Sequence, residues 1–205
     1  MKGIRGVVTY NCNIMCSCCT YRCGPHRKGI MDVKDFERYI KDYYDEGYSD
    51  YIIIEGGEPL LQSGIIFKYL KSIRNINSRK YIVTNGYWGN LEAYIYILED
   101  IKNMGLSGII LEYDYFHSIF IDFKTIKNAI EKSLQWNLEV WVKAFFSNSG
   151  INCEEDEITF DYIKEIKKNY GEIKFIFQSP DKNKMPYRRA LGVEEKTLMY
   201  RCIDS

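Results

Sequence analysis

The sequence predicts an α/β protein in which parallel strands form one sheet covered by helices. Six short apolar runs recur along residues 1–180, and segments with helical spacing of apolar residues separate them. Strands buried on both faces are nearly continuous apolar runs, and a helix after each strand returns the chain for parallel pairing. Such a sheet is either an open doubly wound layer or a partial barrel. Both place the active site at the carboxyl ends of the strands.

The individual elements follow in alternating order. The first strand carries the β-branched pair Val7 and Val8 at its centre. Asp32 suits the N-cap of the first helix, and Gly47 suits its C-terminal stop. The expected strands cover residues 4–10, 51–54, 80–84, 108–113, 138–146 and 173–177. The expected helices cover residues 33–46, 65–73, 91–104, 123–136 and 160–170.

Composition argues against several classes of function. At 205 residues, the chain is long enough for one domain with a substantial core. Lys plus Arg and Asp plus Glu both number 28, so no basic excess indicates a nucleic-acid partner. No stretch approaches the roughly 18 consecutive apolar residues of a membrane-spanning helix, and the start lacks the apolar segment of a signal peptide. We therefore expect a cytoplasmic protein without nucleic-acid or membrane partners.

The cysteines are crowded into one short stretch. Five of the seven lie between residues 12 and 23, which in a chain without a secretory signal indicates metal or cluster binding. Cys12, Cys16 and Cys19 have the spacing C-x3-C-x2-C, and thiolates are the ligands of iron–sulfur clusters. Three thiolates leave one iron of a [4Fe–4S] cluster open for a substrate or cofactor. Because an open iron is sensitive to oxygen, an anaerobic, reducing cytoplasm is expected.

Polar residues recur at the predicted carboxyl ends of the strands, which meet at one edge of a parallel sheet. An Asn-Gly pair is most often a turn, and a lone charged residue at a strand end is most often solvated. The position of these residues on the edge that carries the cysteine loop favours a functional site. The residues are Glu55, Gly56, Gly57, Glu58, Pro59, Thr84, Asn85, Glu112, Asp114, His117, Lys143, Ser147 and Gln178.

The C-x3-C-x2-C loop after the first strand, followed by Gly56-Gly57-Glu58-Pro59 after the second, resembles the radical S-adenosylmethionine (radical SAM) superfamily. The resemblance covers residues 1–180 as a core domain and implies a partial (β/α)6 barrel, with residues 181–205 as a short C-terminal extension. It implies one [4Fe–4S] cluster and S-adenosylmethionine as cofactors. The cluster ligands implied are Cys12, Cys16 and Cys19, and the residues implied for the methionine amino group are Gly56, Gly57, Glu58 and Pro59.

The resemblance also assigns other rim residues to the cofactor. Cys18 stands where the family commonly has an aromatic residue, so its backbone would approach the adenine. A cluster register that uses Cys18 as a ligand stays open. Glu112 or Asp114 would accept from the ribose hydroxyls, Lys143 would pair with the methionine carboxylate, and Asn85 would contact the cofactor from the end of the third strand.

Asp114 and His117 are the catalytic candidates. They belong to Asp114-Tyr115-Phe116-His117, which resembles a D-x-F-H segment found in a subset of radical enzymes. His117 is expected to touch substrate or cofactor, and the alternative is a structural histidine bonded to a loop carbonyl.

The function implied is reductive cleavage of S-adenosylmethionine to a 5′-deoxyadenosyl radical, which abstracts hydrogen from a peptide or small-metabolite substrate. A one-electron donor such as flavodoxin or ferredoxin would reduce the cluster. An alternative within the family is an activase that generates a glycyl radical on a partner protein. An alternative of a different class is a non-catalytic iron–sulfur or zinc-binding protein.

Overall fold

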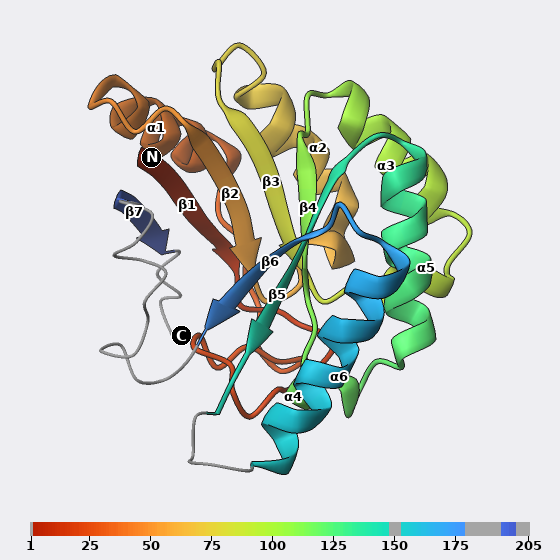
Figure 1. The fold of residues 1–205 in the computed structure, drawn as a ribbon. Helices are drawn as coiled ribbons and strands as arrows, with labels where there is room; N and C mark the ends of the chain where they lie inside the picture. Colours follow the sequence, from red (N-terminus) through yellow and green to blue (C-terminus); the bar gives the residue numbers. More distant parts are fainter. Residues whose placement is uncertain (1, 148–152, 179–193, 200–205) are drawn as a thin grey trace.

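The computed structural model describes residues 2–147, 153–178 and 194–199. Seven parallel strands form one curved sheet in the order β6-β5-β4-β3-β2-β1-β7, and helices cover its outer face (Figure 1). The prediction of a parallel α/β sheet is confirmed. The strands are β1 Lys2–Thr9, β2 Tyr51–Gly56, β3 Arg79–Thr84, β4 Gly108–Glu112, β5 Glu139–Phe145, β6 Lys174–Gln178 and β7 Glu194–Met199.

Helices follow the strands at about the predicted places. Asp32 caps α1 by accepting a hydrogen bond from the Lys34 amide, as the sequence predicts. The helix α6 begins six residues before the predicted start at residue 160, because its first turn holds four acidic residues that favour a helix N-terminus. The helices are α1 Val33–Asp45, η1 Pro59–Gln62, α2 Ser63–Ser72, η2 Tyr87–Asn90, α3 Tyr94–Asn103, α4 Tyr115–Ser118, α5 Phe123–Gln135 and α6 Glu154–Asn169.

The seventh strand, β7, was not predicted. It pairs in parallel with the outer side of β1, from Lys2 opposite Glu194 to Val7 opposite Met199. The segment Glu194–Met199 begins with charged residues and has no continuous apolar run, and edge strands tolerate such sequences. Among the described strands, β6 and β7 are the two edges, so the barrel is incomplete between them.

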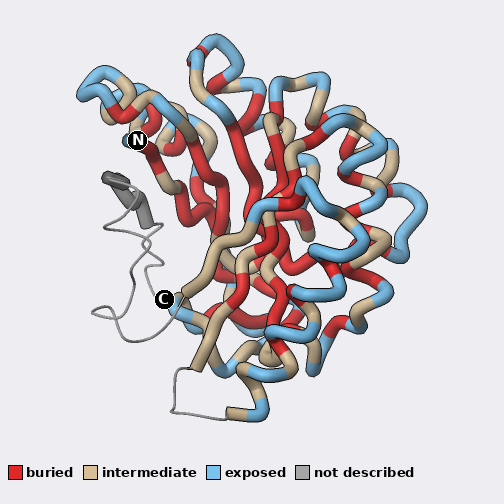
Figure 2. The backbone as a smooth tube through the Cα atoms, in the orientation of Figure 1, coloured by how far each residue is buried: buried red, intermediate tan, exposed pale blue. Residues whose placement is uncertain are grey.

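Buried residues concentrate along the strands, while the outer sides of the helices are exposed (Figure 2). The larger core lies between the sheet and the helices. A second, smaller core fills the inner face of the sheet with Ile53, Tyr81, Val83 and Ile110. Among the described residues, no helix combines the length and apolar character needed to cross a membrane.

The inner face of the sheet changes character along the strands. Residues two positions apart on a strand share a face. Glu55 therefore follows Ile53 on the inner face of β2, and Glu112 follows Ile110 on the inner face of β4. Charged side chains consequently stand above an apolar floor, at the carboxyl end of the sheet.

Candidate active site

The cysteine loop, residues 11–31, starts where β1 ends and is bonded directly to the end of β2. The Gly57 amide donates to the Thr9 carbonyl at 2.7 Å, and the Glu58 amide donates to the Asn11 carbonyl at 2.8 Å. A Cβ atom on Gly57 would lie 2.0 Å from the Asn11 carbonyl oxygen. Glycine is therefore required here because the two backbones approach so closely.

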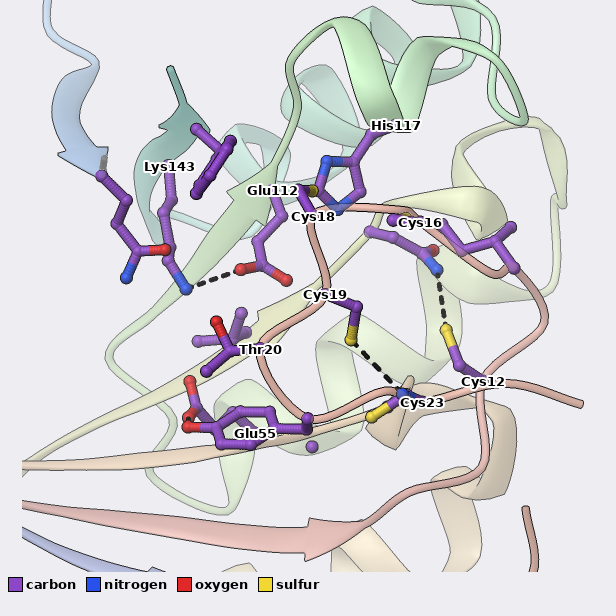
Figure 3. Close-up of a pocket in the computed structure, with 18 of the residues that line it drawn as sticks. Cys12, Cys16, Cys18, Cys19, Thr20, Cys23, Glu55, Glu112, His117 and Lys143 are labelled. Atoms are coloured by element: carbon purple, nitrogen blue, oxygen red, sulfur yellow. Dashed lines mark hydrogen bonds and ion pairs between the residues drawn. The ribbon is translucent and has the colours of Figure 1, made fainter. Parts of the chain in front are cut away.

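A cavity of about 190 Å³ opens at this end of the barrel, and the cysteine loop forms one wall (Figure 3). The Cys19 amide donates to the Cys16 carbonyl at 3.1 Å, and the Cys12 sulfur accepts from the Asn85 side-chain amide at 3.7 Å. The three cysteines of the motif all line this one cavity. Because several thiols border the same space, the residues fit a thiolate-ligated cluster. Its five cysteines are Cys12, Cys16, Cys18, Cys19 and Cys23.

The two thiols outside the motif have different surroundings. The Cys18 sulfur lies within 4.8 Å of ligand atoms of Asp114 and His117. Burial raises the pKa of the Cys18 thiol, and the carboxylate of Asp114 adds to the effect. The Cys23 amide donates to the Cys19 sulfur at 3.4 Å. A hydrogen bond with the Cys23 side chain lowers the pKa of Cys19 to about 6, against the opposing effect of burial.

The carboxylate of Glu58 is enclosed by donors of the chain itself. It accepts from the Leu60 amide at 3.0 Å, the Asn85 amide at 2.7 Å and the Thr84 hydroxyl at 2.9 Å. The residue is 1% exposed. Burial raises the pKa of Glu58 to about 7, although these hydrogen bonds oppose the rise. Glu58 thus fixes the junction between β2, η1 and β3. Gly56 and Gly57, which precede it, line the cavity.

Asn85 connects this junction to the cysteine loop. Its backbone amide binds Glu58, and its side-chain amide donates to the Asn13 side-chain oxygen at 2.9 Å as well as to the Cys12 sulfur. Pro59 occupies the first turn of η1, for which Glu58 is the N-cap. A proline suits this position because its missing amide proton is not needed there.

Two pairs of opposite charge stand on the inner face of the sheet. Lys143 of β5 lies 2.6 Å from Glu112 of β4, and Arg5 of β1 is paired with Glu55 of β2. The Tyr21 hydroxyl, from the cysteine loop, donates to Glu55 at 2.5 Å. Burial favours the neutral form of Glu112, but the charges of Lys143 and His117 outweigh it and hold the pKa of Glu112 below its ordinary value.

Asp114, the N-cap of α4, and His117 of α4 line the cavity close to Cys18 of the cysteine loop. One oxygen of Asp114 accepts from the His117 amide at 3.1 Å and lies 2.8 Å from the His117 Nδ1. The other oxygen accepts from the Phe145 amide at 3.0 Å. His117 is 8% exposed. Burial alone would lower the pKa of His117, but the hydrogen bond with Asp114 and the nearby negative charges of Asp114 and Cys16 raise it well above its ordinary value.

The structure therefore brings most of the predicted site residues to one cavity. Arg5, Tyr21 and Cys23 also line it and were missed. A charged residue within the apolar first strand was the available signal for Arg5, because a parallel strand buried on both faces has no ordinary place for it. Those predicted from the sequence that line the cavity are Cys12, Cys16, Cys18, Cys19, Glu55, Gly56, Gly57, Asn85, Glu112, Asp114, His117, Lys143 and Gln178.

A comparison with known protein families finds a match for most of the chain. The sequence model of the radical SAM superfamily matches residues 7–146. A curated relative, the putative peptide biosynthesis protein YydG of Bacillus subtilis (strain 168), is 21% identical over 129 residues. That match covers 61% of this chain and 40% of the relative, so the chain spans less than half the length of the curated protein.

Solved structures share the fold at low identity. HydG, a maturase of the [FeFe]-hydrogenase, matches with a TM-score of 0.61 and 14% identity over 91% of this chain and 46% of its own. TsrM is a radical S-adenosylmethionine methyltransferase from Kitasatospora setae, with cobalamin and a [4Fe–4S] cluster bound. It matches with a TM-score of 0.56 and 13% identity, over 86% of this chain and 36% of its own. SuiB of Streptococcus suis, bound to S-adenosylmethionine, matches with a TM-score of 0.50 and 13% identity, over 96% of this chain and 56% of its own.

Proposed function

Because the chain belongs to the radical SAM superfamily, whose members are enzymes that use a [4Fe–4S] cluster and S-adenosylmethionine, we propose that it abstracts hydrogen from a peptide or small polar substrate. Cys12, Cys16 and Cys19 would hold the cluster. The observation that carries the proposal is their convergence on one cavity with the backbone of Gly56 and Gly57. When bound and reduced by a donor such as flavodoxin or ferredoxin, the cluster supplies the electron that releases a 5′-deoxyadenosyl radical from S-adenosylmethionine.

The glycine segment would receive the methionine ammonium. Backbone carbonyls are acceptors for an ammonium group, and Gly56 and Gly57 line the cavity without side chains that would block the approach. Glu58 supports this arrangement from behind the cavity wall, because its carboxylate already binds Leu60, Thr84 and Asn85. Its role is to hold the glycine backbone in place.

The pair of Glu112 and Lys143 would receive the rest of the cofactor. Both side chains stand on the inner face of the sheet and line the cavity. Lys143 can pair with the methionine carboxylate, and Glu112 can accept from ribose hydroxyls. Since they are 2.6 Å apart, a ligand that engages both must separate or share the existing ion pair.

The substrate proposed is a peptide or another polar molecule. Arg5, Glu55, Tyr21 and Gln178 line the same cavity as the cysteines, so the space beside the cluster is charged and rich in hydrogen-bonding groups. A polar substrate can exchange hydrogen bonds with these groups, whereas an apolar substrate cannot. The match to a putative peptide biosynthesis protein favours a peptide.

Anaerobic reconstitution tests the proposal. We expect about four irons per chain and formation of 5′-deoxyadenosine from S-adenosylmethionine after reduction. Cys12→Ala, Cys16→Ala and Cys19→Ala should each abolish the cluster, whereas Cys18→Ala and Cys23→Ala are the matched controls that retain it. A colourless zinc protein without cleavage activity would refute the proposal, and loss of the cluster in Cys18→Ala would refute the ligand set.

A further inference from the structure

The middle of the cysteine loop, residues 14–22, is joined to the sheet by one side chain. Backbone hydrogen bonds hold the two ends of the loop, for example from the Gly24 amide to the Tyr10 carbonyl at 3.2 Å. Among the described residues, Tyr21 makes the only hydrogen bond from residues 14–22 to the sheet, and its hydroxyl donates to Glu55 of β2 at 2.5 Å. The other hydrogen bonds of this stretch stay within the loop.

The two ends of this hydrogen bond belong to the two parts of the site that have to fit together. Residues 14–22 carry Cys16 and Cys19, two of the three proposed cluster ligands. Glu55 directly precedes Gly56, where the segment proposed for the methionine ammonium begins. Figure 3 shows Glu55 beside the stretch of the loop that follows Cys19. The hydrogen bond therefore spans from the cluster ligands to the cofactor-binding glycines.

The acceptor of the hydrogen bond is itself held in place. Glu55 lies on β2, is 3% exposed and is paired with Arg5 of the neighbouring strand β1. A carboxylate accepts and does not donate, so the phenol of Tyr21 is the donor. Hydrogen bonds to charged acceptors are stronger than neutral ones. The Tyr21–Glu55 bond is thus a firm attachment to a rigid part of the barrel.

We propose that Tyr21 is a positioning residue, which fixes residues 14–22 relative to Gly56 and Gly57 so that the open iron and the methionine group meet in the correct geometry. The proposal rests on the proposed function, because it takes Cys16 and Cys19 as cluster ligands. Misplacement of reacting groups by about 1 Å can slow a reaction about a hundredfold, so one loop attachment can decide the rate.

A second interpretation of Tyr21 is a contact with the substrate, since Tyr21 and Glu55 both line the cavity. A residue that only contacts the substrate affects neither the binding nor the cleavage of S-adenosylmethionine when no substrate is present. An assay with S-adenosylmethionine, dithionite as the reductant and no added substrate therefore distinguishes the two interpretations.

The test compares reconstituted wild type with Tyr21→Phe, which removes one oxygen and keeps the ring. Glu55 stays paired with Arg5 in this variant, so we expect about four irons per chain. The concentration of S-adenosylmethionine that gives half of the change in the electron paramagnetic resonance spectrum of the reduced cluster should rise about tenfold. At saturating S-adenosylmethionine, formation of 5′-deoxyadenosine per cluster should slow about tenfold.

Glu55→Gln keeps an oxygen that accepts from Tyr21 and removes the charge, so its rate per cluster should lie between those of wild type and Tyr21→Phe. Tyr170→Phe is the matched control, because the Tyr170 hydroxyl donates to Glu131 at 2.7 Å on the exposed surface of the helices. It removes the same kind of phenol–carboxylate hydrogen bond and should change neither the spectrum nor the rate.

Equal half-saturation and equal rates per cluster in wild type and Tyr21→Phe would overturn the proposal. So would a loss of iron in Tyr21→Phe with an unchanged rate per remaining cluster, because Tyr21 would then serve only to stabilise the loop. If Tyr21→Phe takes up no cluster, Glu55→Gln decides: a reduced rate supports the proposal and a wild-type rate overturns it. A wild-type protein without a cluster would instead refute the proposed function.

Discussion

The β2–β3 side and the β4–β5 side of the barrel rim each present a carboxylate, and the two have opposite surroundings. Glu58, after β2, is bonded to neutral donors on η1 and β3. Glu112, at the end of β4, faces the ammonium of Lys143 on β5 at 2.6 Å. Burial without a cation raises the pKa of Glu58 to about 7, whereas Lys143 holds the pKa of Glu112 below its ordinary value.

This difference indicates that the Glu58 carboxylate supports the structure of the site, whereas the Glu112 carboxylate is placed to contact a ligand. The hydrogen bonds of Glu58 join three chain segments, and the residue is 1% exposed. The β2–β3 side therefore supports the site structurally. The Glu112–Lys143 pair lines the cavity, so the β4–β5 side offers charges that a ligand can reach. Changes on the first side should therefore reduce stability, and changes on the second should reduce cofactor binding with little loss of stability.

The largest expected effect comes from Gly57→Ala on the β2–β3 side. The added Cβ would meet the Asn11 carbonyl oxygen at 2.0 Å and force the β2 end away from the cysteine loop. We expect the free energy of unfolding to fall by roughly 3 kcal/mol or more, and the reconstituted iron content to fall with it. Urea denaturation and iron analysis measure the two effects.

Gly64→Ala is the control for that substitution. Gly64 lies in α2, and a Cβ there meets no atom within 4 Å. Alanine should stabilise the helix by about 0.5–1 kcal/mol and leave iron binding unchanged. Equal behaviour of the two variants would show that the contact between β2 and the cysteine loop is not required.

The next effect is the pH dependence that Glu58 gives to the apo-protein. Its pKa rises on folding from 4.5 to about 7, so the folded state binds the proton more tightly than the unfolded state. The resulting stabilisation is fully present below pH 4.5 and is lost as the pH rises through about 7. The size of the shift corresponds to about 3 kcal/mol.

Glu58→Gln removes this titration and keeps the side-chain shape. Wild type should lose about 3 kcal/mol of unfolding free energy relative to the variant between pH 4.5 and pH 7, measured by urea denaturation in matched buffers. A parallel pH dependence in the two proteins would mean that the pKa of Glu58 does not rise on folding, and the contrast with Glu112 would disappear.

The sequence patterns predict most strands of the sheet, but fewer of the side-chain contacts at the carboxyl ends of the strands. The continuous apolar strands predict β1 to β6 because burial on both faces leaves a strong pattern, whereas the charged edge strand β7 leaves none. The cysteine spacing predicts which residues can share a cavity. That the Glu58 carboxylate points toward Thr84 could not be predicted from the sequence. This hydrogen bond joins residues 26 apart and depends on how β2 and β3 align.

The pairing of Arg5 with Glu55 illustrates the same limit. Both residues are visible in the sequence as charges within or beside apolar strands. Their contact depends on the parallel register of β1 and β2 and on the side of the sheet that each faces. Period-two alternation gives the relative face of residues on one strand, but not which face becomes the inside of a barrel.

The smallest effect on stability should come from Lys143→Met on the β4–β5 side. The Lys143 side chain is 12% exposed and that of Glu112 is 27% exposed, so water can compensate part of the lost ion pair. We expect a loss of about 1 kcal/mol in unfolding free energy. Binding of S-adenosylmethionine to the reconstituted protein should weaken about tenfold, because about 1.4 kcal/mol from a charge-assisted bond is lost.

Lys127→Met is the matched control, since Lys127 forms an ion pair with Glu165 at 3.3 Å on the outer surface. It should change neither quantity beyond about 0.5 kcal/mol. Equilibrium dialysis with labelled S-adenosylmethionine measures the affinities. If Lys143→Met lowers stability as much as Gly57→Ala and leaves binding intact, then Lys143 is structural, because its charge would serve to neutralise Glu112 within the fold and not to hold a ligand.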